Sequence, residues 1–254
     1  MAGEPVCGGA VTSNPYFEEV RRLLSWAEST QAESIAAAAD LVAQALATGG
    51  LWHVFGTGHG HLLAEEVFYR AGGLMAVNAI LEPGLMLHDS AVASTGFERL
   101  PGYAAIVLAK HSLRAGDVLL VASNSGRNAV PIEAALFARE QGLAVIALTS
   151  VTHSRAVPSR HPSGKKLYEV ADVVLDNGGC LGDAAVTIPG LAGPVGATST
   201  VVGAALLHWL EYQVVQRLLA RGVVPDVIIS ANSPGGDEHN ETTLAAYRSR
   251  IRCL

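Results

Sequence analysis

The sequence has few cysteines and few charged residues for its length, and each shortage excludes a class of protein. Cys7, Cys180 and Cys253 are the three cysteines in 254 residues, and no two of them have a CxxC spacing. Neither a disulfide framework nor a cysteine-based zinc site is therefore indicated. Charged residues make up 16% of the chain and the formal net charge is -6. This balance argues against a nucleic-acid-binding surface.

The sequence also lacks an uninterrupted apolar run long enough to span a membrane. Its longest weakly polar stretch, 186–210, is interrupted by Pro189, Pro194 and His208, so a spanning helix is a poor interpretation of it. The first eleven residues, MAGEPVCGGAV, have neither the basic start nor the apolar core of a signal peptide. We therefore expect a cytoplasmic protein with no membrane or nucleic-acid partner.

Small aliphatic residues are abundant, in runs that alternate with segments of helical periodicity. Half of the residues are hydrophobic, whereas aromatic residues make up 6%. This composition suits parallel strands covered by helices on both faces. Because strands and helices alternate along the chain, the sequence predicts an α/β protein with three layers, α/β/α, and right-handed crossovers.

The predicted elements follow from periodicity and from helix start and stop signals. We expect helices at 14–48, 62–71, 103–111, 128–141, 165–170, 199–221 and 242–250. Strands are expected at 51–56, 74–80, 117–122, 144–149 and 172–176, and 225–230 is a candidate last strand. Segments 81–101, 150–164 and 178–198 are expected to be irregular, apart from a short helix near Leu85. No linker divides the chain, so we expect one domain over 1–254, with its core at about 35–220, an N-terminal helix and a C-terminal segment at 223–254.

The most informative stretch is SNSGRN, which follows the third predicted strand and precedes an amphipathic helix. Ser123 and Ser125 can donate hydroxyl hydrogen bonds, and Gly126 allows a ligand to approach the backbone closely. The free N–H groups and the dipole of the following helix favour an anion. A phosphate is the predicted ligand. The alternative is that Ser125 or Asn128 only caps the helix.

A second glycine-bearing loop, GTGHGH at 56–61, follows the first predicted strand. Both loops belong to the same edge of a parallel sheet, where ligands bind in such folds. GTGHGH lacks the third glycine of GxGxxG and no acid ends the second strand, so a dinucleotide is not predicted, nor any other cofactor. The candidate substrate-binding residues are Gly56, Thr57, Gly58, His59, Ser123, Asn124, Ser125, Gly126 and Asn128.

These motifs resemble those of the sugar isomerase, or SIS, domain family, and of its small stand-alone bacterial branch in particular. The resemblance is carried by GTGHGHLLAEE, by SNSGRN and by DVVLDNG at the fifth strand, while SANSPGGDEHNE looks like a mark of one branch. It covers the chain from about Asn14. It implies a five-stranded parallel sheet of flavodoxin-like type, phosphosugar binding, and a homo-oligomer, dimer or tetramer, with sites near the subunit contact.

The resemblance also assigns individual positions. Ser123, Ser125 and Asn128 match the family's phosphate loop, with Asn128 in place of the usual Ser or Thr. Gly60 stands where relatives commonly have a Ser. That departure removes one hydroxyl from the sugar pocket.

Carboxylates and imidazoles near the two loops are the candidates for proton transfer, which both sugar isomerisation and ether elimination require. His61 and Glu65 are four residues apart at the start of a helix and would share a face. His239 follows a glycine hinge and could reach into a site. Glu65, His61 and His239 are the predicted catalytic residues. The alternatives are that Glu65 lies on a solvated helix face and that His239 is solvated.

Other titratable residues are weaker candidates for a catalytic or metal-binding role. Glu82, His88 and Asp89 follow the second strand, in a loop where such residues more often lie at the surface. His59 and His61, with His88, Asp89 or His239, could assemble a zinc site. HxH alone is a weak signal, and no metal is predicted.

Two functions from different classes fit these observations. The first is a phosphosugar isomerase or lyase that acts by carboxylate and histidine acid–base chemistry. The second is a non-catalytic sensor that binds a sugar phosphate and signals through a protein partner. Transcriptional relatives carry an additional helix-turn-helix domain, for which the single long helix expected before the first strand leaves no room.

Overall fold

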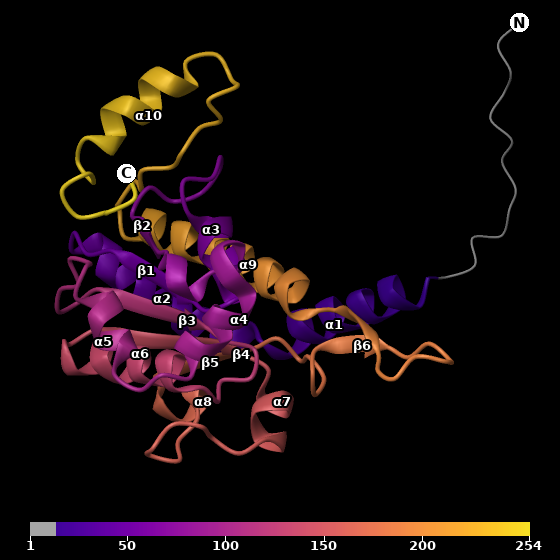
Figure 1. The fold of residues 1–254 in the computed structure, drawn as a ribbon. Coiled ribbons are helices and arrows are strands. Elements are labelled where there is room, and N and C mark those ends of the chain that lie inside the picture. Colours follow the sequence, from indigo (N-terminus) through magenta and orange to yellow (C-terminus); the bar gives the residue numbers. More distant parts are fainter. Residues whose placement is uncertain (1–13) are drawn as a thin grey trace, which may run out of the picture.

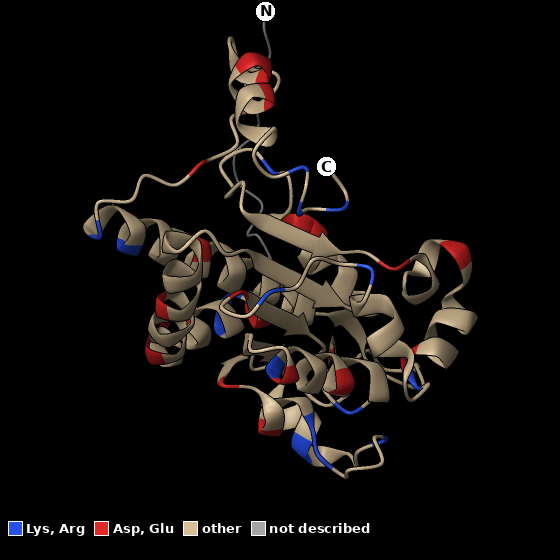
Figure 2. Cartoon of the chain, turned by 90° about the vertical axis from the view of Figure 1, so that its left-hand side faces the viewer, with Lys and Arg blue, Asp and Glu red and all other residues tan. Residues whose placement is uncertain are grey.

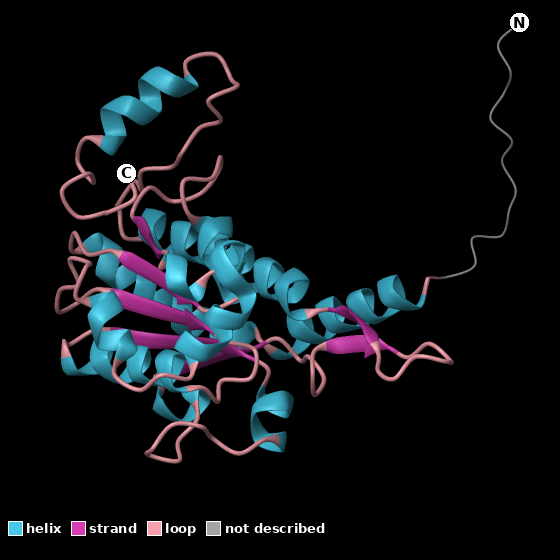
Figure 3. Cartoon of the chain, viewed as in Figure 1, coloured by secondary structure: helices cyan, strands magenta, loops and turns pink. Residues whose placement is uncertain are grey.

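The computed structural model describes residues 14–254 and contains a five-stranded parallel sheet with helices on both faces (Figures 1 and 3). The sheet order is β2-β1-β3-β4-β5. The predicted fold class is therefore confirmed. The strands are β1 (Trp52–Gly56), β2 (Val77–Ile80), β3 (Val118–Ala122), β4 (Ala144–Thr149) and β5 (Val173–Asp176).

The strand order reverses between β1 and β3. From β1 the chain crosses to β2 on one side, and then returns to place β3 on the other side, with Trp52 level with both Val77 and Val118. Residues of β1 and β3 are buried throughout, because both faces of the sheet are covered. In open parallel sheets a ligand crevice forms at the carboxyl ends of the strands at such a reversal.

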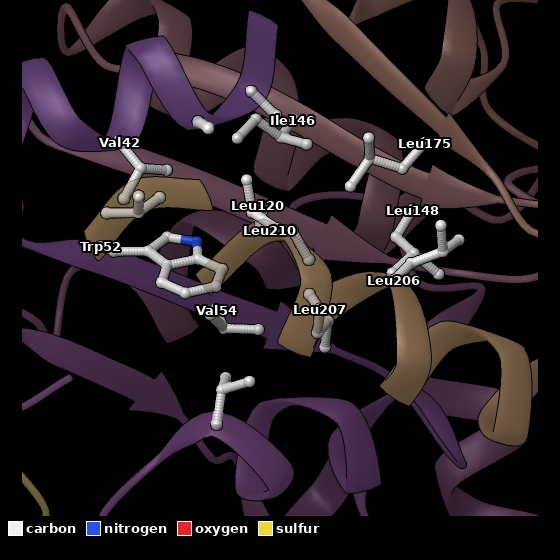
Figure 4. Packing of buried hydrophobic residues seen from close by; sticks show 14 of the residues in the cluster. Val42, Trp52, Val54, Leu120, Ile146, Leu148, Leu175, Leu206, Leu207 and Leu210 are labelled. Atoms are coloured by element: carbon white, nitrogen blue, oxygen red, sulfur yellow. The ribbon is translucent and has the colours of Figure 1, made fainter. Parts of the chain in front are cut away.

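Successive strand residues pack into separate cores on the two faces of the sheet. Trp52 and Val54 of β1 pack with Leu207 and Leu210 of the long C-terminal helix (Figure 4), whereas Phe55 belongs to the opposite core. The first core includes residues of α1 (Pro15–Thr30), α2 (Ala32–Ala47), α3 (Gly60–Val67) and α9 (Ser199–Ala220). The second includes residues of α5 (Tyr103–Leu108), α6 (Ala129–Glu140) and α8 (Leu167–Val170).

The single helix predicted over 14–48 is wrong: two helices, α1 and α2, stand there. Gln31 leaves helical geometry between them, with ψ 3°, and its side-chain oxygen accepts a hydrogen bond from the Asp176 N–H at 2.9 Å. This contact with the end of β5 is tertiary, so no Gly or Pro marks the break. Asn14 caps α1, accepting from the Tyr16 N–H at 3.0 Å. Ser13, whose hydroxyl makes it a second candidate cap in the sequence, lies outside the described residues, as does Cys7.

Three segments expected to be irregular contain short elements. Segment 81–101 forms the 3-10 helix η1 (Pro83–Leu85), which confirms the short helix expected near Leu85, and also α4 (Leu87–Glu98). Segment 150–164 contains α7 (Val151–Ala156). Segment 178–198 contains an antiparallel hairpin of β6 (Ala184–Val186) and β7 (Val195–Ala197). η1, α7, β6 and β7 are too short for a periodic signal, and α4 has almost no apolar face. Contacts with neighbouring elements stabilise them, such as the 2.8 Å bond from Ser94 Oγ to the Leu85 carbonyl.

The C-terminal segment also differs from prediction. The candidate strand at 225–230 is reduced to one antiparallel bridge between Val227 and Leu74. The chain pairs there with the segment before β2 and does not extend the sheet. The last helix, α10, spans Gly236–Leu244 rather than 242–250. Its position follows from Asn240, whose side chain bonds both the N–H and the carbonyl of Ile229.

A buried carboxylate at the amino ends of β1 and β3 ties this C-terminal segment to the sheet. Asp117 accepts hydrogen bonds from His53 Nε2 at 3.0 Å, from the Leu51 N–H at 2.8 Å and from Arg250 Nη2 at 2.8 Å. Arg250 also donates to the Gly49 carbonyl. Burial alone would raise the pKa of Asp117, but these donors outweigh it and lower the pKa to about 2. The carboxylate is therefore ionised at neutral pH.

Candidate functional site

A cavity of about 460 Å³ opens at the carboxyl ends of β1 and β3, where the strand order reverses. The loops after both strands line it, and α4, α7 and the start of α9 complete its walls. Its polar lining consists mainly of hydroxyl and amide groups, with few titratable side chains. The polar lining residues are Thr57, His59, Ser94, Thr95, Glu98, Ser123, Asn124, Ser125, Asn128, His153, Asn177, Asp183, Ser199 and Thr200.

The loop after β3 presents unbonded donors to this cavity. Asn128 is the N-cap residue of α6, yet its side chain makes no capping hydrogen bond. Within residues 14–254, the N–H groups of Ser125, Arg127 and Asn128 and the hydroxyl of Ser125 have no acceptor. The alternative that Ser125 or Asn128 serves only as a helix cap therefore does not describe this loop. Free N–H groups and a free hydroxyl at a helix start form an anion site.

Gly126 gives this loop its shape. Its φ of +55° is in the left-handed region, and a Cβ there would lie 3.1 Å from Thr149 Oγ1 and 3.2 Å from Ser154 Oγ. The Gly126 N–H donates to Ser123 Oγ at 3.3 Å, which closes the turn. A side chain at this position would strain the loop and push it away from its neighbours.

The loop after β1 approaches the end of β3 closely through Gly60. A Cβ at Gly60 would lie 2.6 Å from the Ala122 carbonyl oxygen at the end of β3. A serine, which the SIS resemblance leads one to expect here, therefore does not fit this backbone. Thr57 supplies the nearest hydroxyl in the same loop, and its Oγ1 donates to Glu98 Oε1 at 2.7 Å.

The structure brings most of the predicted binding residues together. Gly56 and Gly126 lie behind the cavity wall and shape the two loops, without lining the cavity. The residues predicted from sequence that line the cavity are Thr57, Gly58, His59, Ser123, Asn124, Ser125 and Asn128.

The three predicted catalytic residues lie outside the cavity lining. Glu65 is exposed on α3, and His239 lies at the surface on α10 with its Nε2 3.1 Å from the Val227 carbonyl. His61 is buried, and its Nδ1–H donates to the Gly58 carbonyl at 3.3 Å. No hydrogen bond or ion pair joins the three among the described residues. Their catalytic role stays a prediction.

Three titratable side chains that the sequence analysis did not identify line the cavity: Glu98, His153 and Asp183. Glu98 comes from α4, and its Oε2 is free of hydrogen bonds within the described chain. His153 comes from α7, and its Nδ1 is buried without a partner. Burial lowers the pKa of His153, and the nearby carboxylate of Asp183 raises it in part. The positive charges of Arg127 and Lys166 lower it further. The position of His153 just after β4 is the one signal that could have identified it.

Asp183 lines the cavity but is already engaged. It caps α9 by accepting from the N–H groups of Thr198 and Ser199, at 3.1 and 2.8 Å, and from the Ser199 hydroxyl at 2.6 Å. Its backbone has a φ of +70°, unusual for a non-glycine residue. Asp183 thus orients the start of α9 at the cavity wall.

The described residues contain neither a metal cluster nor a membrane span. No three or more His, Cys, Asp or Glu side chains in 14–254 are placed to hold a metal ion together. The histidines considered for zinc are thus not assembled. None of the helices in this range combines the length and apolar character needed to cross a bilayer.

We expect two imidazoles, the buried His61 and the half-buried His111, to make stability fall in mild acid. Burial lowers the pKa of both His61 and His111 to about 4, against about 6.5 in an unfolded chain. Between these pH values the unfolded chain binds more protons, so the free energy of unfolding decreases as pH falls from about 6.5 to about 4. Urea unfolding at several pH values measures this, with His61→Gln and His111→Gln variants expected to flatten the dependence. A pH-independent midpoint in the wild type would contradict it.

Comparison with known proteins agrees with this architecture. The SIS domain model matches residues 15–150. The chain is 42% identical over 241 residues to UPF0309 protein GK1441 of Geobacillus kaustophilus, covering 95% of this chain and 96% of that protein. The phosphoheptose isomerase GmhA of Neisseria gonorrhoeae superposes with a TM-score of 0.52 at 24% identity, over 78% of this chain and 92% of the other.

A regulator shares the fold as well. The sugar isomerase domain of the RpiR transcription factor of Sphaerobacter thermophilus superposes with a TM-score of 0.50 at 20% identity, over 81% of this chain and 90% of the other. At such identities these superpositions establish the fold alone. The same fold therefore occurs in an isomerase and in a transcription factor.

Proposed function

Because the chain belongs to the SIS-domain family, we propose that it binds a phosphorylated sugar in the cavity, with the phosphate on the loop Ser123–Asn128. The observation that carries this proposal is the set of unbonded N–H groups and the free Ser125 hydroxyl at the start of α6. A phosphate dianion accepts several such bonds at once, and the α6 dipole favours its charge. Hydroxyl and amide groups on the remaining walls suit the sugar hydroxyls.

The chemistry we propose is proton transfer, as in an isomerase or a lyase. Glu98 is the base that removes a proton from the carbon beside the sugar carbonyl, and the Thr57 hydroxyl orients it through Oε1. His153 moves protons between sugar oxygens. Its lowered pKa keeps it neutral at pH 7, so that it can accept as well as donate.

Calorimetric titration with hexose, heptose and N-acetylhexosamine phosphates tests the binding. We expect at least one to bind, and Ser125→Ala to weaken it by roughly tenfold or more, since a hydrogen bond to a charged group contributes about 1.5–3 kcal/mol. Ser29→Ala on α1, an exposed serine far along the chain from both loops, is the control and leaves affinity unchanged. Failure of every phosphate to bind, or no effect of Ser125→Ala, would count against the proposal.

A non-catalytic sensor is the second candidate, because the RpiR domain has the same fold. It binds the sugar phosphate without turnover and acts through a protein partner. Following the bound sugar by NMR in deuterated water separates the two. Exchange of a carbon-bound proton indicates an enzyme, and an unchanged spectrum indicates the sensor.

We also propose that the protein acts as a homo-oligomer, a dimer or a tetramer, in the cytoplasm. The long helix α9 exposes Val201, Tyr212 and Leu219, at 41%, 58% and 53% of their surfaces. An exposed apolar row on a helix that also packs in the core suits a contact between copies. Light scattering measures the mass, and a value near the 26.3 kDa of one chain would contradict the proposal.

A further inference from the structure

Three arginines gather beside the phosphate loop without a carboxylate partner. Arg127 belongs to the loop, Arg99 follows α4, and Arg160 comes from the segment between α7 and α8. None of the ion pairs within residues 14–254 includes them, whereas Arg139 and Arg217 elsewhere each pair with an aspartate. In a chain of net charge -6 these arginines form a local excess of positive charge. We call them the arginine cluster.

Hydrogen bonds join Arg160 to Arg127 and to Asn128 in the cavity wall, and Arg99 is close enough to Arg160 for its charge to act on it. Arg160 Nη1 donates to Asn128 Oδ1 at 3.0 Å, and the Arg160 N–H donates to the Arg127 carbonyl at 2.7 Å. Asn128 itself lines the cavity. Because its oxygen faces Arg160, its NH₂ group is left to donate toward a ligand. Arg127 Nε is buried and has no acceptor within the described chain.

The like charges of the arginine cluster repel one another. Burial lowers the pKa of Arg160, the neighbouring charges of Arg127 and Arg99 lower it further, and Glu98 opposes them. More positive charge lies along the adjacent α7–α8 segment, at the lower end of the molecule in Figure 2. Like charges held close together raise the energy of the free protein, and an anion bound among them removes that repulsion.

We propose that the ligand carries a second anionic group, a carboxylate or a further phosphate, which Arg99, Arg127 and Arg160 bind while the loop holds the first phosphate. This inference rests on the proposed function. Guanidinium groups bind carboxylate and phosphate through paired N–H donors. The N–H groups of the loop and the Ser125 hydroxyl already supply donors for one phosphate, so the cluster provides for another charge. The substrate class is a doubly anionic sugar phosphate.

Two matched ligand pairs test the inference by calorimetry at low ionic strength. 6-Phosphogluconate and glucitol 6-phosphate differ only at C1, a carboxylate against a hydroxymethyl group. Fructose 1,6-bisphosphate and fructose 6-phosphate differ only by the second phosphate. We expect the doubly anionic member of at least one pair to bind about tenfold more tightly or better. In the Arg99→Met and Arg160→Met variants, the ratio of the affinities within that pair falls toward one.

Arg155→Met is the matched control. Arg155 is exposed on α7, with its guanidinium over the Tyr168 ring and outside the arginine cluster, so the preference is retained. Equal affinities within both pairs would overturn the inference while leaving phosphosugar binding intact. If none of the four ligands binds, the inference fails, whereas the proposed function fails only if the heptose and N-acetylhexosamine phosphates do not bind either. A loss of preference in Arg155→Met as large as in Arg160→Met would also overturn it, since net charge alone would then explain the effect.

Discussion

Glu98→Gln is expected to slow exchange of the carbon-bound proton of the sugar phosphate by at least about 100-fold, because a positioned general base contributes roughly 10²–10⁴ in rate. The glutamine keeps the size of the side chain and can still accept from the Thr57 hydroxyl through its amide oxygen. It cannot take up the proton. NMR in deuterated water measures the exchange rate, and calorimetry on the same sample shows whether the ligand is still bound.

Two companion variants sharpen this test. Glu33→Gln, exposed on α2, leaves the exchange rate unchanged. Glu65→Gln separates the sequence-based assignment from the one based on the cavity. If Glu65→Gln abolishes exchange and Glu98→Gln does not, the base is Glu65 and the role given to Glu98 is wrong.

Asp117→Ala is expected to reduce the free energy of unfolding by about 3–5 kcal/mol, the usual cost of removing one partner from a buried ion pair. The substitution leaves Nη2 of Arg250 and the N–H of Leu51 without their acceptor in a buried site. It also removes the hydrogen bond of His53. Urea unfolding followed by circular dichroism measures the loss.

An exposed pair supplies the control for Asp117. Asp40 pairs with Arg217 at 2.7 Å, but 61% of its side chain is exposed, so Asp40→Ala costs about 1 kcal/mol or less. A loss of under 1 kcal/mol for Asp117→Ala would show that the cluster around Asp117 does not stabilise the fold.

The half of the site built from strand ends could be predicted from the sequence. The apolar runs of β1 and β3 are each followed by a glycine-bearing polar loop, and a parallel sheet brings these loops to one edge. Thr57 and Ser125 were therefore expected near each other, and both line the cavity.

The other half depends on tertiary contacts that no local pattern records. Glu98 reaches the cavity from α4, a helix with a kink at Ser90 and almost no apolar face. Asp183 enters from the turn before a short hairpin, where its side chain caps α9. Spacing along the chain therefore could not have placed Glu98 or Asp183 at the cavity. The same limit explains Gln31, whose break between α1 and α2 follows from its bond to β5.

The most direct test of phosphate binding by the loop Ser123–Asn128 is a ¹H–¹⁵N NMR titration of the full chain with the hexose, heptose and N-acetylhexosamine phosphates. We expect the backbone amides of Ser125, Arg127 and Asn128 to shift most on saturation, with smaller shifts at Thr57 and Gly58 across the cavity. The unphosphorylated sugars leave these signals unmoved. Saturable binding that perturbs other parts of the chain and leaves the amides of 123–128 unchanged would contradict the account.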